Sequence, residues 1–354
     1  METYHVIGVM SGTSLDGVDI AYCEFHKTGD EWSFAIINAE TLRYEPHWKN
    51  ILSGLENKSA LEFARIHMEY GHYIGKAVKE FINRNVLEID FVCSHGHTIF
   101  HQPENKLTVQ IGSGAAIAAE CRLPVVCDFR SVDVALGGQG AFLVPIGDKL
   151  LFHQYDFCLN LGGFANISFE EKRERTAFDI CPVNIVLNAL ASQAGKEYDS
   201  NGEMAQSGVL NEQLLMELNE LNFYSKTPPK SLGKEWVLRF INPLLEKYSI
   251  PLNDKIRTVT EHVAMQISAV LKKSAEKNML ITGGGAYNQF LIQRIRDLSS
   301  MEIKLPADEV IDNKEALIFA FLGVLRMRKQ INCLSSVTGA ESDNVGGAVY
   351  RPFS

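Results

Sequence analysis

Residues Val6-Ile-Gly-Val-Met-Ser-Gly-Thr-Ser-Leu-Asp-Gly-Val-Asp-Ile-Ala-Tyr-Cys23 decide how the chain folds. An apolar strand is followed by a turn of small residues over 11–17 and then by a second apolar strand. Glycines let backbone N–H groups converge on one point, and a concavity of donors between strands suits a phosphate. The alternative is a plain hairpin, although two-residue turns make hairpins with fewer residues. The stretch predicts a hairpin and favours one that binds phosphate.

An acidic side chain lies within this turn. Asp16 would repel a phosphate that it touched directly, so we expect it to hold a phosphate-bound Mg²⁺ through water. The seven cysteines are scattered, odd in number and contain no Cys-x-x-Cys pair. This pattern supports neither a disulfide framework nor a zinc site.

The composition of the 354 residues is that of a soluble globular protein with room for two domains, at 46% apolar and 22% charged residues. A net charge of −9 argues against a general nucleic-acid binder. The N-terminus lacks the basic and apolar regions of a signal peptide, and the longest apolar run, 316–325, is too short to span a bilayer. We therefore expect a cytoplasmic protein with neither a nucleic-acid nor a membrane partner.

Histidines follow a predicted strand over 89–93, where ligands bind in α/β folds. His95, His97 and His101 suggest a metal, but no cysteine or carboxylate ligand lies nearby in the sequence. Hydrogen bonding to a substrate is favoured over metal binding, and a structural role is the alternative.

An arginine follows the next strand, 123–127, and precedes a glycine-rich loop. Arg130 therefore fits binding of a polar or anionic substrate group. The alternative is a structural pair with Asp128 or Asp133.

The second half of the chain repeats the opening pattern. Residues 155–169 form two apolar strands around the small-residue turn Gly162-Gly163-Phe164-Ala165-Asn166. This echo indicates a structural duplication in which each domain offers a phosphate-binding hairpin.

A carboxylate follows this second hairpin. Asp179 ends a predicted short strand, and Pro182 and Asn184 begin an apolar helix over 185–191. The side chain can therefore point into a cleft beside a helix N-terminus. As an alternative Asp179 caps the helix, although Asn184 or Cys181 is better placed to do so.

Three glycines, Gly283, Gly284 and Gly285, stand between a strand and a helix that begins at Asn288. Such a turn lets a flat nucleoside approach the backbone closely. The last long helix is predicted over 313–329, with Glu315 near its start.

The order of the three glycine-rich turns resembles that of the actin, sugar-kinase and heat-shock-chaperone ATPase superfamily. More closely, the chain resembles the anhydro-N-acetylmuramic acid kinase family. The matching stretches are 8–19, Ser94-His-Gly-His-Thr98, Asp128-Phe-Arg130 with Gly137-Gly-Gln-Gly140, Asn160-Leu-Gly-Gly-Phe-Ala-Asn-Ile167, Pro228-Pro-Lys-Ser231, Thr282-Gly-Gly-Gly285 and Val337-Thr-Gly-Ala340. Three positions depart from the family pattern: His97 replaces a glutamine, and Ile180-Cys181 replaces Thr-Gly beside the catalytic carboxylate.

The resemblance implies an α/β, two-lobe actin-like ATPase fold, a duplicated ribonuclease H-like architecture with an interdomain cleft that closes on its ligands. We expect an N-terminal lobe over 1–140, with the tail from about 335 to 354 packed on it, and a C-terminal lobe over 141–334. The family suggests a homodimer.

The implied activity is an ATP- and Mg²⁺-dependent kinase. It opens the 1,6-anhydro ring of anhydro-N-acetylmuramic acid with water and phosphorylates O6, giving N-acetylmuramic acid 6-phosphate in peptidoglycan recycling. The departures leave two alternatives, a related kinase for a different sugar and a non-catalytic ATP-binding sensor. A structural protein without a ligand is the third.

The resemblance also assigns residues. Asp179 is the predicted catalytic base, and Asp16 is the predicted metal ligand. The predicted substrate-binding residues are Glu315, Arg130, His95 and Asn184. The predicted ATP-binding residues are Ser11, Gly12, Thr13, Ser14, Asp16, Gly17, Asp19, Gly162, Gly163, Asn166, Gly283, Gly284, Gly285 and Asn288.

Overall fold

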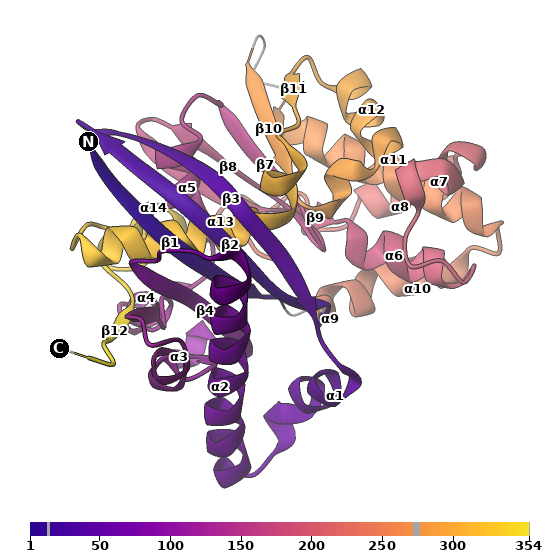
Figure 1. The fold of residues 1–354 in the computed structure, drawn as a ribbon. Coiled ribbons are helices and arrows are strands. Elements are labelled where there is room, and N and C mark those ends of the chain that lie inside the picture. Colours follow the sequence, from indigo (N-terminus) through magenta and orange to yellow (C-terminus); the bar gives the residue numbers. More distant parts are fainter. Residues whose placement is uncertain (13–14, 272–276, 354) are drawn as a thin grey trace. The chain divides into compact units, whose positions relative to one another are not determined.

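The computed structural model describes residues 1–12, 15–271 and 277–353, and the chain divides into two compact units (Figure 1). One unit comprises Met1–Leu151 with Asn313–Ser354, and the other comprises Phe152–Asp312. The sequence places 141–151 and 313–334 in the second lobe, whereas the contacts within the chain group them with the first unit.

The first unit is built on a seven-stranded sheet with the order β12-β6-β4-β1-β2-β3, and β5 pairs with β4. β1 is antiparallel to β2 and parallel to β4. The strands are β1 (Glu2–Ser11), β2 (Gly17–Thr28), β3 (Glu31–Arg43), β4 (Phe91–Gln102), β5 (Leu107–Ile111), β6 (Val125–Cys127) and β12 (Ala348–Tyr350). The tail strand β12 pairs antiparallel with β6.

The second unit repeats this plan in a five-stranded sheet with the order β11-β10-β7-β8-β9. Its strands are β7 (Phe157–Leu161), β8 (Phe164–Glu171), β9 (Glu174–Pro182), β10 (Asn278–Thr282) and β11 (Glu302–Lys304). In both units, three consecutive antiparallel strands are extended by parallel strands beside the first of the three. The shared strand order confirms the predicted α/β class and the duplication.

Helices and short turns of helix complete each unit. In the first unit they are α1 (Pro46–Gly54), η1 (Leu55–Asn57), α2 (Ala60–Asn85), η2 (Pro103–Asn105), α3 (Gly114–Cys121), α4 (Ser131–Ala135), α5 (Val144–Leu151), α13 (Asp308–Met327, which starts in the second unit) and α14 (Ser335–Thr338). In the second they are α6 (Asn184–Ser192), η3 (Ser200–Gly202), α7 (Glu203–Ser207), α8 (Glu212–Asn219), α9 (Lys234–Trp236), η4 (Val237–Ile241), α10 (Asn242–Lys247), α11 (Leu252–Leu271), η5 (Gly284–Tyr287) and α12 (Gln289–Leu298).

Each unit has its own hydrophobic core. In the first, α2 buries Tyr70, Ile74, Val78 and Phe81 with side chains of β1, β2 and β4. α13 lies very close to β1, because a Cβ on Gly8 would come within 2.0 Å of the Ala316 carbonyl oxygen. In the second unit, α6, α8, α11 and α12 share one core with β7, β9 and β10, and Figure 1 shows these helices gathered beside that sheet.

Two strands are longer than the sequence predicts. β4 continues through His95 and His97 to Gln102 instead of ending at residue 93, and Asp179 lies inside β9, which runs to Pro182. Both extensions carry polar residues, and backbone pairing with β5 and β8 keeps them in the sheet. The predicted loop residues are therefore held by strands.

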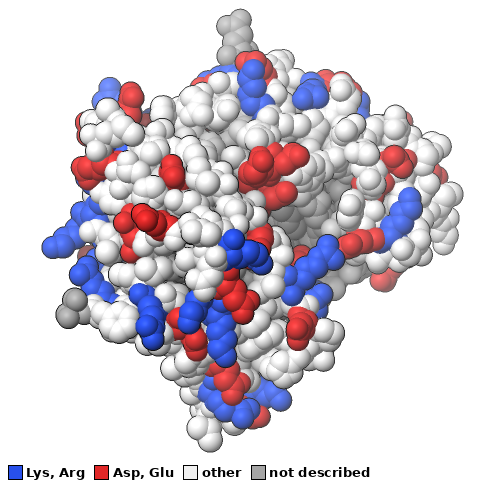
Figure 2. Space-filling model, viewed as in Figure 1, with Lys and Arg blue, Asp and Glu red and all other residues white. Residues whose placement is uncertain are grey.

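Basic and acidic side chains are interspersed over the face drawn in Figure 2. Of the helices in the described part of the chain, none has the length and apolar character that crossing a membrane requires.

Candidate active site

The first hairpin forms as predicted, with Met10 of β1 opposite Asp19 of β2. Gly12 and Asp16 lie between the two strands, Gly17 begins β2, and Leu15 adopts a left-handed φ of 61°. The predicted ATP-binding residues Thr13 and Ser14 lie outside the described residues. Because β1 ends at Ser11 and β2 begins at Gly17, the connection is longer than a two-residue hairpin turn.

The hydroxyl of Ser11 faces into the protein. Ser11 is 2% exposed, and its Oγ lies 2.8 Å from His97 Nδ1 and 2.6 Å from the hydroxyl of Tyr44. Tyr44 in turn hydrogen-bonds the buried hydroxyl of Tyr70. Burial lowers the pKa of His97 to about 4, so its imidazole is neutral at physiological pH. This buried chain of hydrogen bonds holds the end of β1, where the turn begins.

The end of β3 supports the turn from the other side. The Asp16 carbonyl accepts a hydrogen bond from the Tyr44 N–H (3.2 Å), and Asp19 Oδ1 accepts one from Thr41 Oγ1 (2.6 Å). Asp16 itself is exposed and Asp19 is half-buried. The sequence did not single out Tyr44, Tyr70 or Thr41, because their partners are distant along the chain.

No group of three or more His, Cys, Asp or Glu side chains that could hold a metal occurs among residues 1–12, 15–271 and 277–353. Mg²⁺ commonly keeps several waters and takes only one or two carboxylates from protein. The exposed carboxylate of Asp16 fits such a site, and its assignment stays a prediction.

Two of the predicted substrate-binding residues, Arg130 and His95, contact each other. Arg130 Nε donates to His95 Nε2 (2.9 Å), and His95 Nδ1 donates to the Gly96 carbonyl (2.9 Å). Burial and the guanidinium hold the pKa of His95 well below its usual range, so it accepts this bond as a neutral ring. Both side chains also lie over the ring of Phe319.

The alternative that Arg130 forms a structural pair with Asp128 or Asp133 is wrong, because Arg130 hydrogen-bonds neither side chain. Its other hydrogen bond goes to the Gly140 carbonyl. Asp128 accepts from Ser131, and Asp133 accepts from Gly140, Cys333, Thr338 and Asn344. Burial lowers the pKa of Arg130 to about 10, and Glu315 opposes this shift.

Glu315 interacts electrostatically with Arg130. Desolvation raises the pKa of its carboxyl, Arg130 lowers it, and Asp19 raises it further. The residue nevertheless remains accessible to solvent. The first unit thus brings together Arg130, His95 and Glu315 beside an acidic residue of the first hairpin.

The second hairpin is tied to the start of α6. The Gly163 carbonyl accepts hydrogen bonds from the N–H groups of Val183 (2.8 Å) and Ile185 (3.3 Å), and the Gly162 carbonyl accepts one from the N–H of Asn184 (3.3 Å). Asn166 of β8 pairs in register with Asp179 of β9, beside an irregularity in the ladder. The predicted base and the predicted phosphate turn are therefore neighbours.

Asp179 is 7% exposed, and burial raises the pKa of its carboxyl from 3.8 to about 6. One hydrogen bond, from the Leu232 N–H to Oδ2 (2.8 Å), opposes this rise. The alternative role as a helix cap is wrong, because Val183 is the N-cap of α6. Sequence reasoning missed the partner segment, although the Pro228-Pro-Lys-Ser231 motif marked it.

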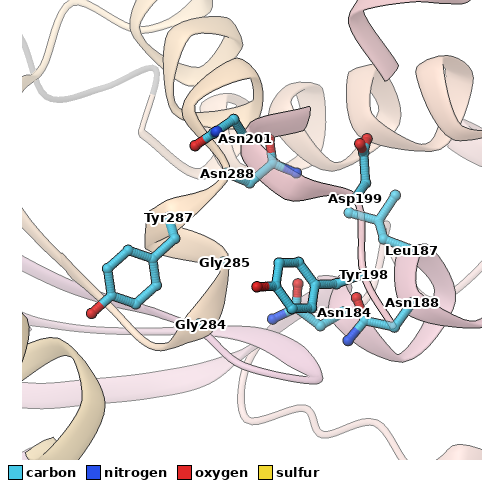
Figure 3. A pocket seen from close by; sticks show the side chains of 10 residues that line it. All are labelled: Asn184, Leu187, Asn188, Tyr198, Asp199, Asn201, Gly284, Gly285, Tyr287 and Asn288. Atoms are coloured by element: carbon cyan, nitrogen blue, oxygen red, sulfur yellow. The ribbon is translucent and has the colours of Figure 1, made fainter. Parts of the chain in front are cut away.

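The glycine triplet borders a pocket of about 330 Å³ in the second unit (Figure 3). Gly283 has a φ of 81°, and a Cβ there would come within 2.5 Å of Asn160 Oδ1. Asn288 caps α12 by accepting from the Leu291 N–H (2.9 Å), as predicted. The pocket is lined by Asn184, Leu187, Asn188, Tyr198, Asp199, Asn201, Gly284, Gly285, Tyr287 and Asn288.

The residues of this pocket that were not predicted from the sequence include two tyrosines and two asparagines, Tyr198, Tyr287, Asn188 and Asn201. Tyr198 and Tyr287 are exposed, and Figure 3 shows their rings at different sides of the hollow. Asn184, predicted to contact the sugar, lies in this pocket and donates from Nδ2 to the Leu161 carbonyl (3.1 Å).

Comparisons with known proteins agree on one family. A model of the family "Anhydro-N-acetylmuramic acid kinase" matches residues 4–352. The enzyme of that name from Francisella tularensis subsp. novicida is 34% identical, over 98% of this chain and 99% of its own length. The one from Clostridioides difficile is 33% identical, over 98% of each chain.

Solved structures with a similar fold are more distant. An activator of 2-hydroxyisocaproyl-CoA dehydratase from Clostridium difficile with bound ADPNP is 12% identical (TM-score 0.44), over 92% of this chain and 97% of that one. A ROK-family glucokinase from Streptomyces griseus in complex with glucose and AMPPNP is 11% identical (TM-score 0.41), over 90% and 98%.

Proposed function

Because this chain belongs to the anhydro-N-acetylmuramic acid kinase family, we propose that it phosphorylates 1,6-anhydro-N-acetylmuramic acid with ATP while water opens the anhydro ring. The product is N-acetylmuramic acid 6-phosphate, an intermediate of peptidoglycan recycling. The observation that carries the proposal is the buried carboxylate of Asp179, which pairs in register with a residue of the second glycine hairpin.

In the proposed reaction two bonds form and two break. The oxygen of water attacks C1 of the sugar, and the C1–O6 bond breaks. O6 takes the γ-phosphoryl group, and the bond from the γ-phosphorus to the bridging oxygen breaks, so that ADP leaves. The water proton passes to Asp179. The departing O6 needs no separate acid, because phosphorus captures it.

Asp179 suits the role of general base. A pKa of about 6 leaves the carboxylate ionised at neutral pH, yet makes it a stronger base than an ordinary aspartate. Its Oδ2 accepts from the Leu232 N–H, so we assign the proton to Oδ1. A carboxylate close to C1 also stabilises the positive charge that develops there.

The predicted ATP-binding residues divide between the units. In the first unit, the hairpin around Gly12 and Gly17 would cradle phosphate oxygens with backbone N–H groups. In the second, Gly162 and Gly163 would do the same, and the pocket beside Gly284 would hold the nucleoside. Mg²⁺, when bound, neutralises phosphate charge, and Asp16 would hold it.

The four predicted substrate-binding residues divide between the nucleotide and the sugar. Asn184 lies between the Gly162 turn and the pocket, so we propose that it contacts the nucleotide and not the sugar. Arg130 offers a cation that fits the acid group of the sugar, His95 orients that guanidinium through Nε2, and Glu315 offers a hydroxyl acceptor. A homodimer in the cytoplasm remains our expectation for the whole protein.

The test is turnover with ATP, Mg²⁺ and the anhydro sugar in wild type and Asp179→Asn. We expect sugar phosphate only from wild type, while both proteins keep the rise in melting temperature that ATP produces. Glu220→Gln removes an exposed carboxylate of the same unit and serves as the control. Unchanged turnover in Asp179→Asn would remove Asp179 from the mechanism.

A further inference from the structure

The predicted base is held by a segment that none of the functional assignments uses. The Asp179 N–H donates to the Lys230 carbonyl (3.1 Å), and the Leu232 N–H donates to Asp179 Oδ2 (2.8 Å). Residues 230 and 232 therefore both bind Asp179, the first at its backbone N–H and the second at its carboxylate. Both contacts use only backbone atoms of the segment, so its position matters more than its side chains at these two points.

The side chain of Lys230 anchors this segment. Its ammonium donates to the Phe223 carbonyl (3.3 Å) and reaches the Tyr224 carbonyl (3.5 Å). It also lies 4.8 Å from the ring centre of Phe223 and 5.8 Å from that of Phe178. The Lys230 ammonium therefore interacts with backbone carbonyls and aromatic rings. Its contacts with residues 223 and 224 hold the two ends of the 223–230 loop together.

The start of the loop is itself immobilised. Phe223 is 4% exposed, and the Tyr224 hydroxyl lies 2.9 Å from Nε2 of His262 on α11. His262 Nδ1 lies 2.7 Å from Asn219 Oδ1. The anchor therefore connects the Asp179 partner segment to the core of the unit.

We infer that residues 223–232 form a strap that orients the Asp179 carboxylate, with Lys230 as the positioning residue that holds the strap. The inference rests on the proposed function of Asp179. It goes further by proposing that the strap sets the pH range in which Asp179 acts as a base, because the Leu232 N–H of the strap hydrogen-bonds its carboxylate.

Three titratable side chains near Asp179 have pKa values that are shifted away from neutral pH. Burial raises the pKa of the Cys181 and Tyr224 side chains and lowers that of His262 to about 3. Burial lowers the pKa of Lys230, whose charge faces Cys181. A change in the acid limb of activity therefore reports on Asp179.

The test compares Lys230→Met with Lys230→Arg, which keeps the charge and the donors, and with Lys226→Met, an exposed lysine of the same loop. Loss of the Leu232 N–H would raise the pKa of Asp179 by about one to two units in Lys230→Met, because a hydrogen bond to a charged group is lost. The acid limb of kcat/KM should move up equally. Both control variants should stay near wild type.

Carbon-13 NMR of the Asp179 carboxyl, assigned with Asp179→Asn, measures this pKa without turnover, and amide exchange reports on the Leu232 N–H. We expect faster Leu232 exchange in Lys230→Met. An unshifted carboxyl titration overturns the strap and leaves the base in place. A shifted pKa with Leu232 still protected also overturns it, since charge alone would then act. Should Lys230→Met unfold, Lys230→Gln takes its place.

If Asp179→Asn remains active, the proposed function fails, while the NMR titration still decides whether the strap sets the pKa of Asp179.

Discussion

At the scale of the residue, Asp179 combines burial with one hydrogen bond. Its pKa is about 6 in the folded protein and 3.8 without burial, so the folded protein binds this proton more tightly. The protonated Asp179 carboxyl stabilises the folded protein at low pH, and this contribution is lost as the pH rises from 3.8 to about 6. We predict that Asp179→Asn raises the free energy of unfolding at pH 7.5 by about 3 kcal/mol.

Urea unfolding at pH 7.5 and pH 4 measures this effect. The gain should be much smaller at pH 4, where the carboxyl is mostly protonated, and Glu220→Gln should show no such dependence. A variant no more stable than wild type at pH 7.5 would show that the ionised carboxylate is not strained by burial.

The chain from His97 through Ser11 and Tyr44 to Tyr70 gives a second prediction at this scale. Tyr44→Phe removes the link in the middle and leaves buried hydroxyls with fewer partners, so it should cost about 1–3 kcal/mol of stability. Because this chain fixes the first hairpin, KM for ATP should rise more than kcat falls. Ser53→Ala, which removes an exposed hydroxyl of α1 in the same unit, is the comparison, and equal KM values in the two variants would contradict the prediction.

At the scale of the element, the strand-to-helix turn over 283–285 requires glycine. Gly283→Ala places a Cβ 2.5 Å from Asn160 Oδ1 at a φ of 81°. We expect a loss of more than about 3 kcal/mol, and no rise in melting temperature with ATP. Gly195 also has a positive φ, of 71°, but open space around it, so Gly195→Ala isolates the cost of φ at about 1 kcal/mol.

The hairpins could be predicted from the sequence, because alternating apolar runs and glycine-rich turns are local signals. The strap could not, since Leu232 contacts Asp179 through its backbone from 53 residues away. Nor could the long β4, since His97 pairs with Ile111 of β5 and with Ser11 of β1 and so keeps this polar stretch in the strand. Local chemistry thus marked the ligand turns, while tertiary pairing decided what holds them.

At the scale of the whole molecule, the two units have separate hydrophobic cores. The second unit, residues 152–312, is continuous in sequence and contains the glycine triplet, the pocket and Asp179. We therefore predict that a protein of residues 152–312 unfolds cooperatively on its own. Its near-UV circular dichroism and urea unfolding would show this, and a non-cooperative transition would contradict it.

The central claim is that one enzyme opens the anhydro ring with water and phosphorylates O6. Mass spectrometry of the product formed in ¹⁸O-labelled water tests it most directly. We predict a sugar phosphate with one ¹⁸O on C1 and none in the phosphoryl group, and no such product from Asp179→Asn. Label in the phosphate, or a phosphorylated sugar whose anhydro ring is intact, would contradict the account.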